Sequence, residues 1–401
     1  MRHLLTVLLI FLLNALVHSQ EPENKKLKED IEFLRQELPV KHVDLFFNLT
    51  PDEFNTRINQ ISSSLSSLNE ETFMNRLFQL MVAIGDEHTR VEPPNMMKYY
   101  LPIRFSQFEE GIFVTEIDSL HSDLLLSRIV AINKQPLKEI IVQFEKIIPS
   151  HNRSYFNFLM LFYLSNSYIL KGMGLSDTTE TISYALKDES GDIREINISP
   201  NQPHNLIKAR ESAISTINSG KSNYLFQFSK PENNLYINYL NCKDDKQYPF
   251  AKFTDDLFLI IENNKPRKII VDLRFNGGGN SKVIQPFLDR IKESYLNEKG
   301  SFYVLIGKNT FSSALLNAID LKRNFNTILV GEPTAGSINH YGETLIFKLP
   351  NTQATVIYST KYFETWKGHD GPLYPDIEIK YSVETFKENK DEALEYVNAQ
   401  E

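Results

Sequence analysis

Residues 268–281 read KIIVDLRFNGGGNS, an apolar run that ends in a polar stretch with three consecutive glycines. A short apolar run bounded by turn signals is typical of a buried strand. Glycine tolerates positive φ and close backbone approach, so the N–H groups of Gly277 to Gly279 could converge on an anion. Because a helical pattern follows from Ser281, we interpret the stretch as the strand, tight turn and helix of an α/β sheet.

The same strand and helix alternation continues on both sides of this stretch. Apolar strands are predicted at LYINYL, SFYVLIG and TILVGEPT, and helices over 249–262, over 281–293 and after Ser312. Such alternation predicts a largely parallel, buried sheet whose functional loops follow the strand ends.

Two further regions precede this sheet. Residues 27–83 repeat apolar side chains at helical spacing and predict a helical layer. The layer ends at AIGDEHTRVEPP, where glycine and two prolines stop the helix and place His88 on a loop. Residues 101–200 combine short β-like runs with the helical run LKEIIVQFEKII, and predict a small separate α+β module.

Composition narrows the class of protein. The chain has 401 residues, 41% of them hydrophobic and 23% charged, which fits two or three globular domains. A net charge of -8 argues against a nucleic-acid partner, and the single Cys242 excludes an intrachain disulfide. Residues 1–19 have the layout of a secretory signal peptide, with no membrane span after it, and predict export to the periplasm or the extracellular space.

Adjacent serines, Ser312 and Ser313, stand where an apolar strand gives way to a helix in GKNTFSSALLNAID. Either serine could cap the helix. The positive end of the helix dipole also favours a developing anion, so either could be a nucleophile with the glycine turn as a source of N–H donors. Nucleotide binding is not indicated, because the glycine triplet lacks the spacing of a dinucleotide fingerprint and no Gly-Lys-Ser/Thr follows it.

Several motifs together carry a family resemblance. VDLRFNGGG, TFSSA, VGEPTAGSINHYGE and YPDIEI occur in the order and spacing of the C-terminal processing, or tail-specific, serine peptidases. IGDEHT resembles the histidine motif of the tricorn-like branch of that family. The resemblance implies an α/β fold with a crotonase-like catalytic core, an N-terminal helical domain that carries the histidine motif, and an inserted PDZ-like module. The implied division is a signal peptide over 1–19, the helical domain over 20–98, the PDZ-like module over 99–202, the core over 203–385 and a polar tail over 386–401.

The resemblance also implies roles for single residues. The nucleophile is Ser312, with Ser313 as the alternate, and the oxyanion hole uses the N–H of Gly278 or Gly279 together with that of Ser313. The lysine base of the serine/lysine members is replaced by Ser337 in TAGSINH.

A histidine is therefore the expected base, unless Lys308 or Lys361 substitutes, because its ordinary pKa suits proton transfer near neutrality. His88 is the first choice for this base, and His340 is its rival.

An acid that orients the base is less clearly marked. Glu87 stands where the tricorn-like enzymes have a serine before the histidine, and Asp370 or Glu343 could serve as the distant acid. Asp86, Glu87 and His88 could instead bind a metal, but no His-Glu-x-x-His or cysteine pair accompanies them, so neither a metal nor a cofactor is expected.

These features predict an exported serine endopeptidase, acting on unfolded or C-terminally exposed polypeptides. The alternative is a non-catalytic protein that binds a ligand or a peptide on the same fold, since fold alone does not decide activity. A small-ester hydrolase that uses the same groups is a third reading.

Overall fold

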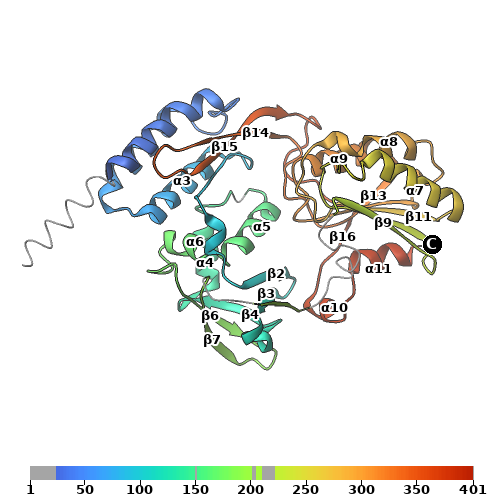
Figure 1. Cartoon of the computed structure of the whole chain (residues 1–401), viewed down its shortest axis with the longest axis horizontal. Coiled ribbons are helices and arrows are strands. Elements are labelled where there is room, and N and C mark those ends of the chain that lie inside the picture. The colour runs from blue at the N-terminus through green and yellow to red at the C-terminus, as the bar shows by residue number, and fades with distance from the viewer. Residues whose placement is uncertain (1–23, 150, 201–204, 210–221, 401) are drawn as a thin grey trace, which may run out of the picture.

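The computed structural model of the chain describes residues 24–149, 151–200, 205–209 and 222–400. The signal peptide predicted over 1–19 lies outside these ranges. None of the helices within them is both long enough and apolar enough to span a membrane. Figure 1 shows a sheet-based core, with the N-terminal helical layer and the predicted module lying beside it. This mixed α/β architecture with several sheets agrees with the predicted fold class.

The core is built on a six-stranded sheet with the order β16-β13-β12-β11-β10-β9. Neighbouring strands are parallel except for β9 and β10, so the predicted largely parallel sheet is confirmed. The strands are β9 (Tyr224–Ser229), β10 (Asn234–Tyr239), β11 (Lys268–Asp272), β12 (Phe302–Ile306), β13 (Thr327–Gly331) and β16 (Ile377–Glu378).

Helices cover both faces of this sheet. One face packs against α7 (Phe250–Asn264), η4 (Ser281–Ile284), α8 (Gln285–Ile291) and α9 (Ser313–Asn324). Alternate strand residues such as Ile270 and Tyr303 point to the other face, where they meet Ala393 and Val397 of α11 (Glu392–Ala399). The stretch predicted as a polar tail therefore contains the end of α10 (Val383–Lys387) and all of α11, which has a buried side because its apolar residues are four apart.

The N-terminal layer is helical, as predicted. It comprises a helix over 24–41, α2 (Pro51–Ser64), η1 (Leu65–Ser67) and α3 (Glu70–Ile84). Thr50 and Glu53 form a capping box that starts α2, and Gly85 ends α3 in the left-handed conformation with φ 84°. The chain then passes through the loop that carries His88 into β1 (Arg90–Glu92), so the predicted loop position is correct.

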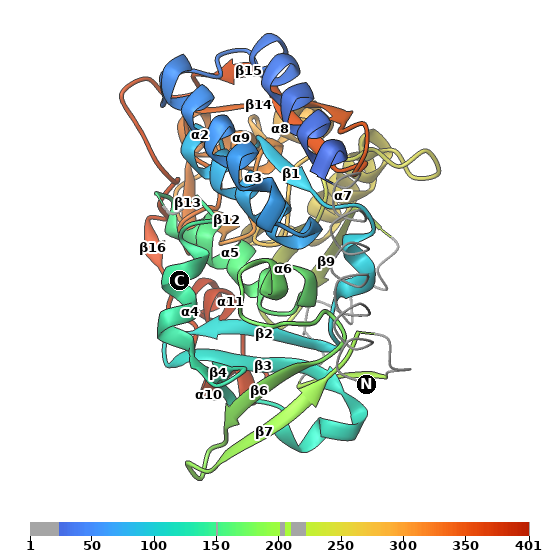
Figure 2. The ribbon, with the colours of Figure 1, turned by 90° about the vertical axis from the view of Figure 1, so that its left-hand side faces the viewer.

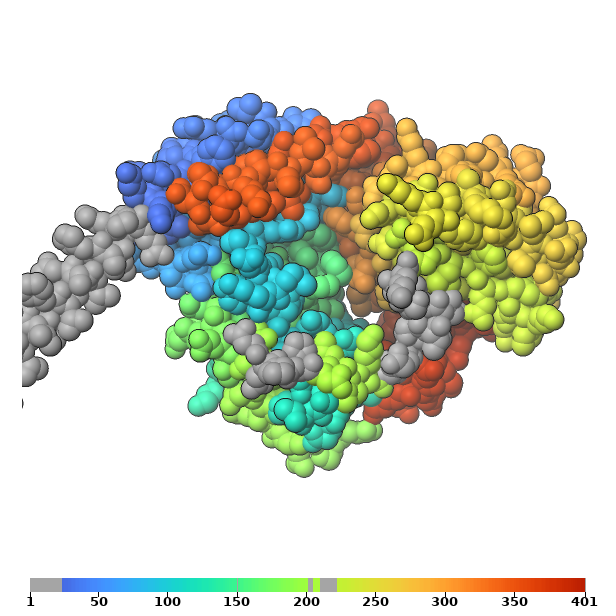
Figure 3. Space-filling view, in the orientation of Figure 1, coloured from blue at the N-terminus to red at the C-terminus, as the bar shows by residue number. Residues whose placement is uncertain are grey.

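A long hairpin leaves the core and joins this layer. β14 (His340–Lys348) and β15 (Thr355–Phe363) form a sheet with β1 in the order β1-β15-β14. Leu349 and Val356 are buried with the N-terminal helices, and Figures 2 and 3 show the hairpin lying against those helices. Residues 340–363 therefore lie outside the core that the sequence predicts over 203–385. The apolar pattern of a hairpin does not show which hydrophobic core will bury it.

The accessory module, as we call residues 101–208, carries an antiparallel sheet with the order β2-β3-β4-β6-β7. Its strands are β2 (Ile103–Phe108), β3 (Gly111–Asp118), β4 (Arg128–Ile132), β5 (Gln135–Pro136), β6 (Ile182–Lys187), β7 (Ile193–Ile198) and β8 (Leu206–Lys208). Its helices are η3 (Ser119–Leu124), α4 (Leu137–Phe144), α5 (Arg153–Tyr163) and α6 (Ser167–Gly172), and η2 (Met96–Tyr99) leads into it. β2 is an edge strand, and its residues 106–108 line a cavity together with Arg274 and Lys308 of the core.

Candidate active site

Ser312 lies at the turn between β12 and α9, in a strained conformation. Its φ of 52° and ψ of -125° are rare for a residue with a side chain. Ser312 occupies the N-cap position of α9, yet its hydroxyl makes no capping hydrogen bond. The Ser313 hydroxyl donates to the Gly279 carbonyl at 2.7 Å. The geometry therefore leaves the Ser312 hydroxyl, and not that of Ser313, available for chemistry.

The glycine turn packs directly against this serine. Gly278 has φ 109°, and a Cβ placed on it would lie 2.8 Å from the Ser312 Cβ and 3.0 Å from the Ser313 nitrogen. A Cβ on Gly279, at φ 136°, would lie 2.4 Å from the Cys242 carbonyl oxygen. Both positions thus need glycine for conformation and for space.

Asn276 decides which backbone N–H groups are free to face an oxyanion. The Gly278 N–H donates to Asn276 Oδ1 at 2.9 Å, and the Asn276 carbonyl accepts the Phe311 N–H at 3.1 Å. In the described chain, no acceptor is recorded for the N–H of Gly279 or for that of Ser313, which opens α9. Of the two glycines suggested by the sequence, Gly279 is the one with a free donor in this conformation.

A buried carboxylate holds the loop that carries His88. Asp86 accepts hydrogen bonds from the His88 backbone N–H at 2.9 Å, from Thr89 Oγ1 at 2.5 Å and from Ser359 Oγ at 2.6 Å, and it pairs with His42 Nε2 at 3.1 Å. Burial alone would raise the pKa of Asp86, but the hydrogen bonds from His42, Ser359 and Thr89 lower it to about 2. The loop is thereby fixed to β15 and to the end of the first helix.

The His88 ring lies beside the turn that carries Ser312. It is 5% exposed and stacks on Phe311, with ring centroids 4.4 Å apart, and on His340, with centroids 5.2 Å apart. Neither ring nitrogen has a hydrogen-bond partner among the described residues. Burial and the neighbouring His340 lower the pKa of His88 to about 3, so the imidazole is neutral, which is the form that can accept a proton.

His340, the rival base, is close to His88 but is engaged differently. Its Nδ1 lies 2.7 Å from the Ser337 carbonyl oxygen, which can only accept, so Nδ1 carries the proton. Burial lowers the pKa of His340 as well. The structure brings both predicted histidines together and leaves Nε2 of each without a competing partner in the described chain.

Glu87 is buried and joins three segments of the chain. Its carboxylate accepts the Ser337 N–H and the Ser337 hydroxyl, each at 3.2 Å, and pairs with His151 Nε2 at 3.1 Å. The side-chain hydrogen bond from His151 to Glu87 raises the pKa of His151. Glu87 and Ser337 are the two residues at which the sequence departs from the family motifs, and here they contact each other. No local signal marked His151.

The remaining carboxylate candidates, Glu343 and Asp370, are both exposed. Glu343 is exposed on β14, and its carboxylate is 3.8 Å from the Lys361 ammonium. Asp370 is exposed, and no hydrogen bond to either histidine is recorded for it within the described chain. Within the described chain, neither carboxylate is recorded as a hydrogen-bond partner of the His88 ring.

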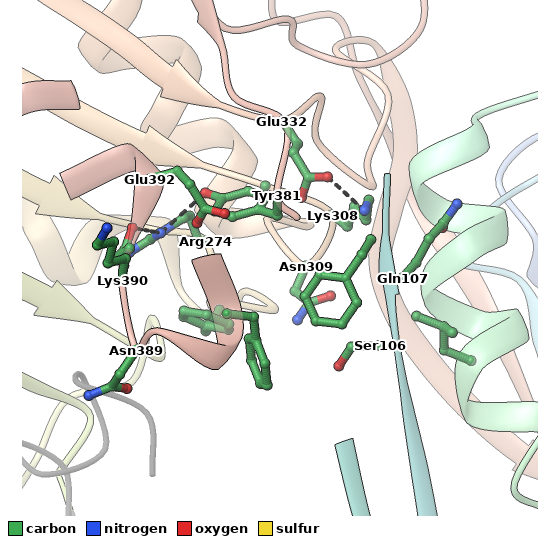
Figure 4. Close-up of a pocket in the computed structure, with 16 residues that line it drawn as sticks. Ser106, Gln107, Arg274, Lys308, Asn309, Glu332, Tyr381, Asn389, Lys390 and Glu392 are labelled. Carbon is green, nitrogen blue, oxygen red and sulfur yellow. Dashed lines mark hydrogen bonds and ion pairs between the residues drawn. The ribbon is translucent and has the colours of Figure 1, made fainter. Parts of the chain in front are cut away.

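Lys308 is likewise committed to an ion pair. Its ammonium lies 2.6 Å from Glu332 at the wall of a cavity of about 230 Å³, formed by the loops after the core strands, β2 and the C-terminal segment (Figure 4). Arg274, at the same wall, is held by Asp272 and Asp391. The paired Lys308 is therefore a poor alternative to a histidine base. In the described ranges, no group of three or more His, Cys, Asp or Glu is placed to hold a metal ion.

Comparisons with known proteins agree with this geometry at the level of the fold. Neither family models nor curated protein sequences give a match. Among solved structures, mature CPAF complexed with lactacystin matches with a TM-score of 0.62 and 13% identity, covering 94% of this chain and 97% of that one. The photosystem II D1 C-terminal processing protease matches with a TM-score of 0.44, 11% identity and coverage of 94% and 96%. The tricorn protease matches with a TM-score of 0.43, 12% identity and coverage of 94% and 36%. The resemblance to the tail-specific peptidases is confirmed for the fold.

Proposed function

We propose that this chain is an exported serine peptidase with a crotonase-like core and a PDZ-like insert, which hydrolyses peptide bonds of unfolded or C-terminally exposed polypeptides. One observation carries the proposal. A strained Ser312 with an unbonded hydroxyl stands at the start of α9, against the turn of Gly278 and Gly279, while His88 stacks on the adjacent Phe311. A nucleophile, N–H donors and a neutral base are the parts that acyl transfer needs.

In the proposed reaction, Ser312 Oγ attacks the carbonyl carbon of the scissile bond as its proton passes to His88. The N–H groups of Gly279 and Ser313 receive the negative charge that develops on the carbonyl oxygen. His88 then returns the proton to the leaving amine as the C–N bond breaks. Water, activated in the same way, releases the acyl group and restores Ser312.

The uncommitted ring nitrogens of His88 fit a base that meets its partner only with substrate in place. A buried polar atom without a partner costs about 1–3 kcal/mol, so the free site gains when a hydrogen bond to Ser312 forms. Catalytic hydrogen bonds are often loose before substrate binds. Export is supported by the layout of residues 1–19, and the accessory module would present an extended peptide through its edge strand β2.

Cleavage of a denatured protein mixture tests the proposal, with fragments identified by mass spectrometry. The mature chain should generate fragments and Ser312→Ala should generate none. Ser313→Ala is the matched control, because it removes a hydroxyl that holds Gly279 and leaves the nucleophile intact. It should retain part of the activity. Full activity in Ser312→Ala would contradict the assignment of the nucleophile.

A binding protein on the same fold is the second candidate. The absence of any recorded acid partner for His88 in the described chain favours it, since catalytic triads orient their base. Native mass spectrometry of the chain purified without refolding would reveal a stoichiometric ligand. Such a ligand, together with inactivity on denatured protein, would replace the peptidase with a carrier.

A further inference from the structure

A cavity of about 290 Å³ opens beside the candidate active site, on the side of His340. Glu87 and Ser337 line it, and Ser337 directly follows Gly336. A Cβ on Gly336 would lie 3.6 Å from the Ser312 nitrogen, so the cavity begins next to the residues that contact the nucleophile. A polypeptide with its carbonyl at Ser312 therefore has a flanking side chain within reach of this cavity.

Three aromatic rings form one wall of the cavity. Phe47 comes from the N-terminal layer, Tyr341 from β14 and Tyr362 from β15. The ring centroids of Phe47 and Tyr341 are 4.5 Å apart, and those of Tyr341 and Tyr362 are 4.8 Å apart. Phe47 is 41% exposed and Tyr362 is 46% exposed. Exposed rings grouped around a cavity indicate a binding surface, and ring faces attract cations.

The charges that line the cavity are mainly negative. The titratable residues there are Asp86, Glu87, His151, His340, Tyr341, Tyr362 and Asp370, and no lysine or arginine is among the lining residues. The Asp86 carboxylate already contacts His42 Nε2 at 3.1 Å, and the Glu87 carboxylate contacts His151 Nε2 at 3.1 Å. For Asp370, no ion pair is recorded in the described ranges. Burial, with the charge of Asp370 as a smaller cause, raises the pKa of Tyr362, which places this carboxylate near the aromatic wall.

The position of Asp370 suits this cavity better than the role of orienting acid. The neighbouring backbone is held by a hydrogen bond from the Ile338 N–H to the Gly371 carbonyl at 2.7 Å, and by a bridge between Ser337 and Pro372. Asp370 is thus fixed at the rim of the cavity. The Nδ1 proton of His340 already points to Ser337, so His340 does not hold Asp370 through that atom.

We propose that this cavity binds the side chain of a lysine or arginine beside the scissile bond of the substrate. Asp370 pairs with the cation, while Tyr341 and Tyr362 cover its aliphatic part. The proposal rests on the proposed peptidase function and gives that function a preference for basic residues. It also assigns Asp370 to specificity and not to the orientation of the base.

Peptides that differ at one position test the preference. For each position flanking the cleavage site, kcat/KM is measured with lysine, glutamine or glutamate. At one position, wild type should prefer lysine over glutamine about 10-fold, since an additional ion pair in a partly buried site contributes about 1.4 kcal/mol. Asp370→Asn should remove this preference through KM, and Asp370→Lys should turn it toward glutamate. Glu364→Gln is the matched control, because it removes an exposed carboxylate near Tyr362 that does not line the cavity.

The results separate this proposal from the function on which it rests. An equal fall in kcat for all three peptides in Asp370→Asn would make Asp370 the orienting acid and overturn the pocket. Equal cleavage of lysine and glutamine peptides at every position by wild type would also overturn it. If wild type cleaves no peptide, the peptidase proposal fails, and the pocket is judged by calorimetry with Ser312→Ala. In that measurement, a lysine peptide that binds no tighter than its glutamine counterpart overturns the pocket.

Discussion

Replacement of Gly278 by alanine should inactivate the site while the same change at Gly277 should not. A Cβ at 278 would approach the Ser312 Cβ to 2.8 Å, the Ser313 nitrogen to 3.0 Å and the Phe311 carbonyl oxygen to 3.1 Å. A Cβ at 277 would have no heavy atom within 4 Å beyond its chain neighbours. Both variants add one methyl group to one turn, so Gly277→Ala controls for the general effect of losing a glycine.

The size of the effect follows from these contacts. Holding a residue with a side chain at an unfavourable φ costs about 1–3 kcal/mol. Overpacking by one methyl group adds about 1–3 kcal/mol. The strain is relieved only if the segment from Phe311 to Ser313 moves, and this segment carries the Ser312 hydroxyl and the Ser313 amide that are proposed to act on the substrate carbonyl. Loss of one oxyanion donor lowers kcat about 10²–10³-fold, so Gly278→Ala should lose at least about 100-fold.

The assay is hydrolysis of a fluorogenic peptide chosen from the fragments of wild-type digestion, measured with thermal unfolding of each variant. Gly278→Ala should lose kcat while it remains folded at the assay temperature, and Gly277→Ala should stay within about threefold of wild type, as expected of an exposed position. Wild-type turnover in Gly278→Ala would refute the role of the glycine turn. An equal loss in Gly277→Ala would show that the turn as a whole, and not its contact with Ser312, is sensitive.

Further predictions concern the base and the hydrogen bonds around it. His88→Ala should abolish turnover, while His340→Ala should retain a measurable fraction of the wild-type kcat. The measurement is kcat of each purified variant, and activity that survives in His88→Ala but not in His340→Ala would make His340 the base. Because the pKa of His88 is lowered to about 3 in the folded state, the unfolded chain binds its proton first, and unfolding free energy should fall as pH drops from about 6.5 toward 3. Chemical denaturation of His88→Gln across that pH range should show a smaller fall in unfolding free energy than wild type. The same dependence on pH in both proteins would contradict the lowered pKa of His88. Asp86 should lower the unfolding free energy further below about pH 4, because its carboxylate takes up a proton in the unfolded chain at a higher pH than in the folded chain. Asp86→Asn should remove this part of the pH dependence. Asn276→Ala removes the side-chain acceptor of the Gly278 N–H but keeps the hydrogen bond from the Phe311 N–H to the backbone carbonyl of residue 276. We therefore expect kcat to change by more than KM. A change in KM alone would contradict a role of this turn in binding the oxyanion.

The sheet and the meeting of Ser312 with the glycine turn follow from rules that a sequence displays. β11 and β12 are adjacent and parallel, so the loops after their carboxyl ends meet at one edge. The helical spacing of apolar residues and the glycine and prolines that follow them also locate the helical layer and the loop of His88. Which of Gly278 and Gly279 has a free N–H could not be predicted in this way, because it depends on one hydrogen bond from the Gly278 N–H to the Asn276 side chain. The sequence pattern does not record such a bond.

The position of His88, the candidate base, depends on contacts between distant parts of the chain. β1 pairs with β15, and Ser359 of β15 donates to Asp86 across 273 positions of sequence, which fixes the loop of His88. His340 opens β14 of the same hairpin and stacks on His88. One hairpin therefore positions both histidines. The hairpin packs against the N-terminal helices because Val356 and Leu349 are buried there. Since such long-range pairing closes large loops, it should form late in folding, after the core sheet that holds Ser312. A core that lacks the N-terminal layer would then keep Ser312 and the glycine turn but lose His88.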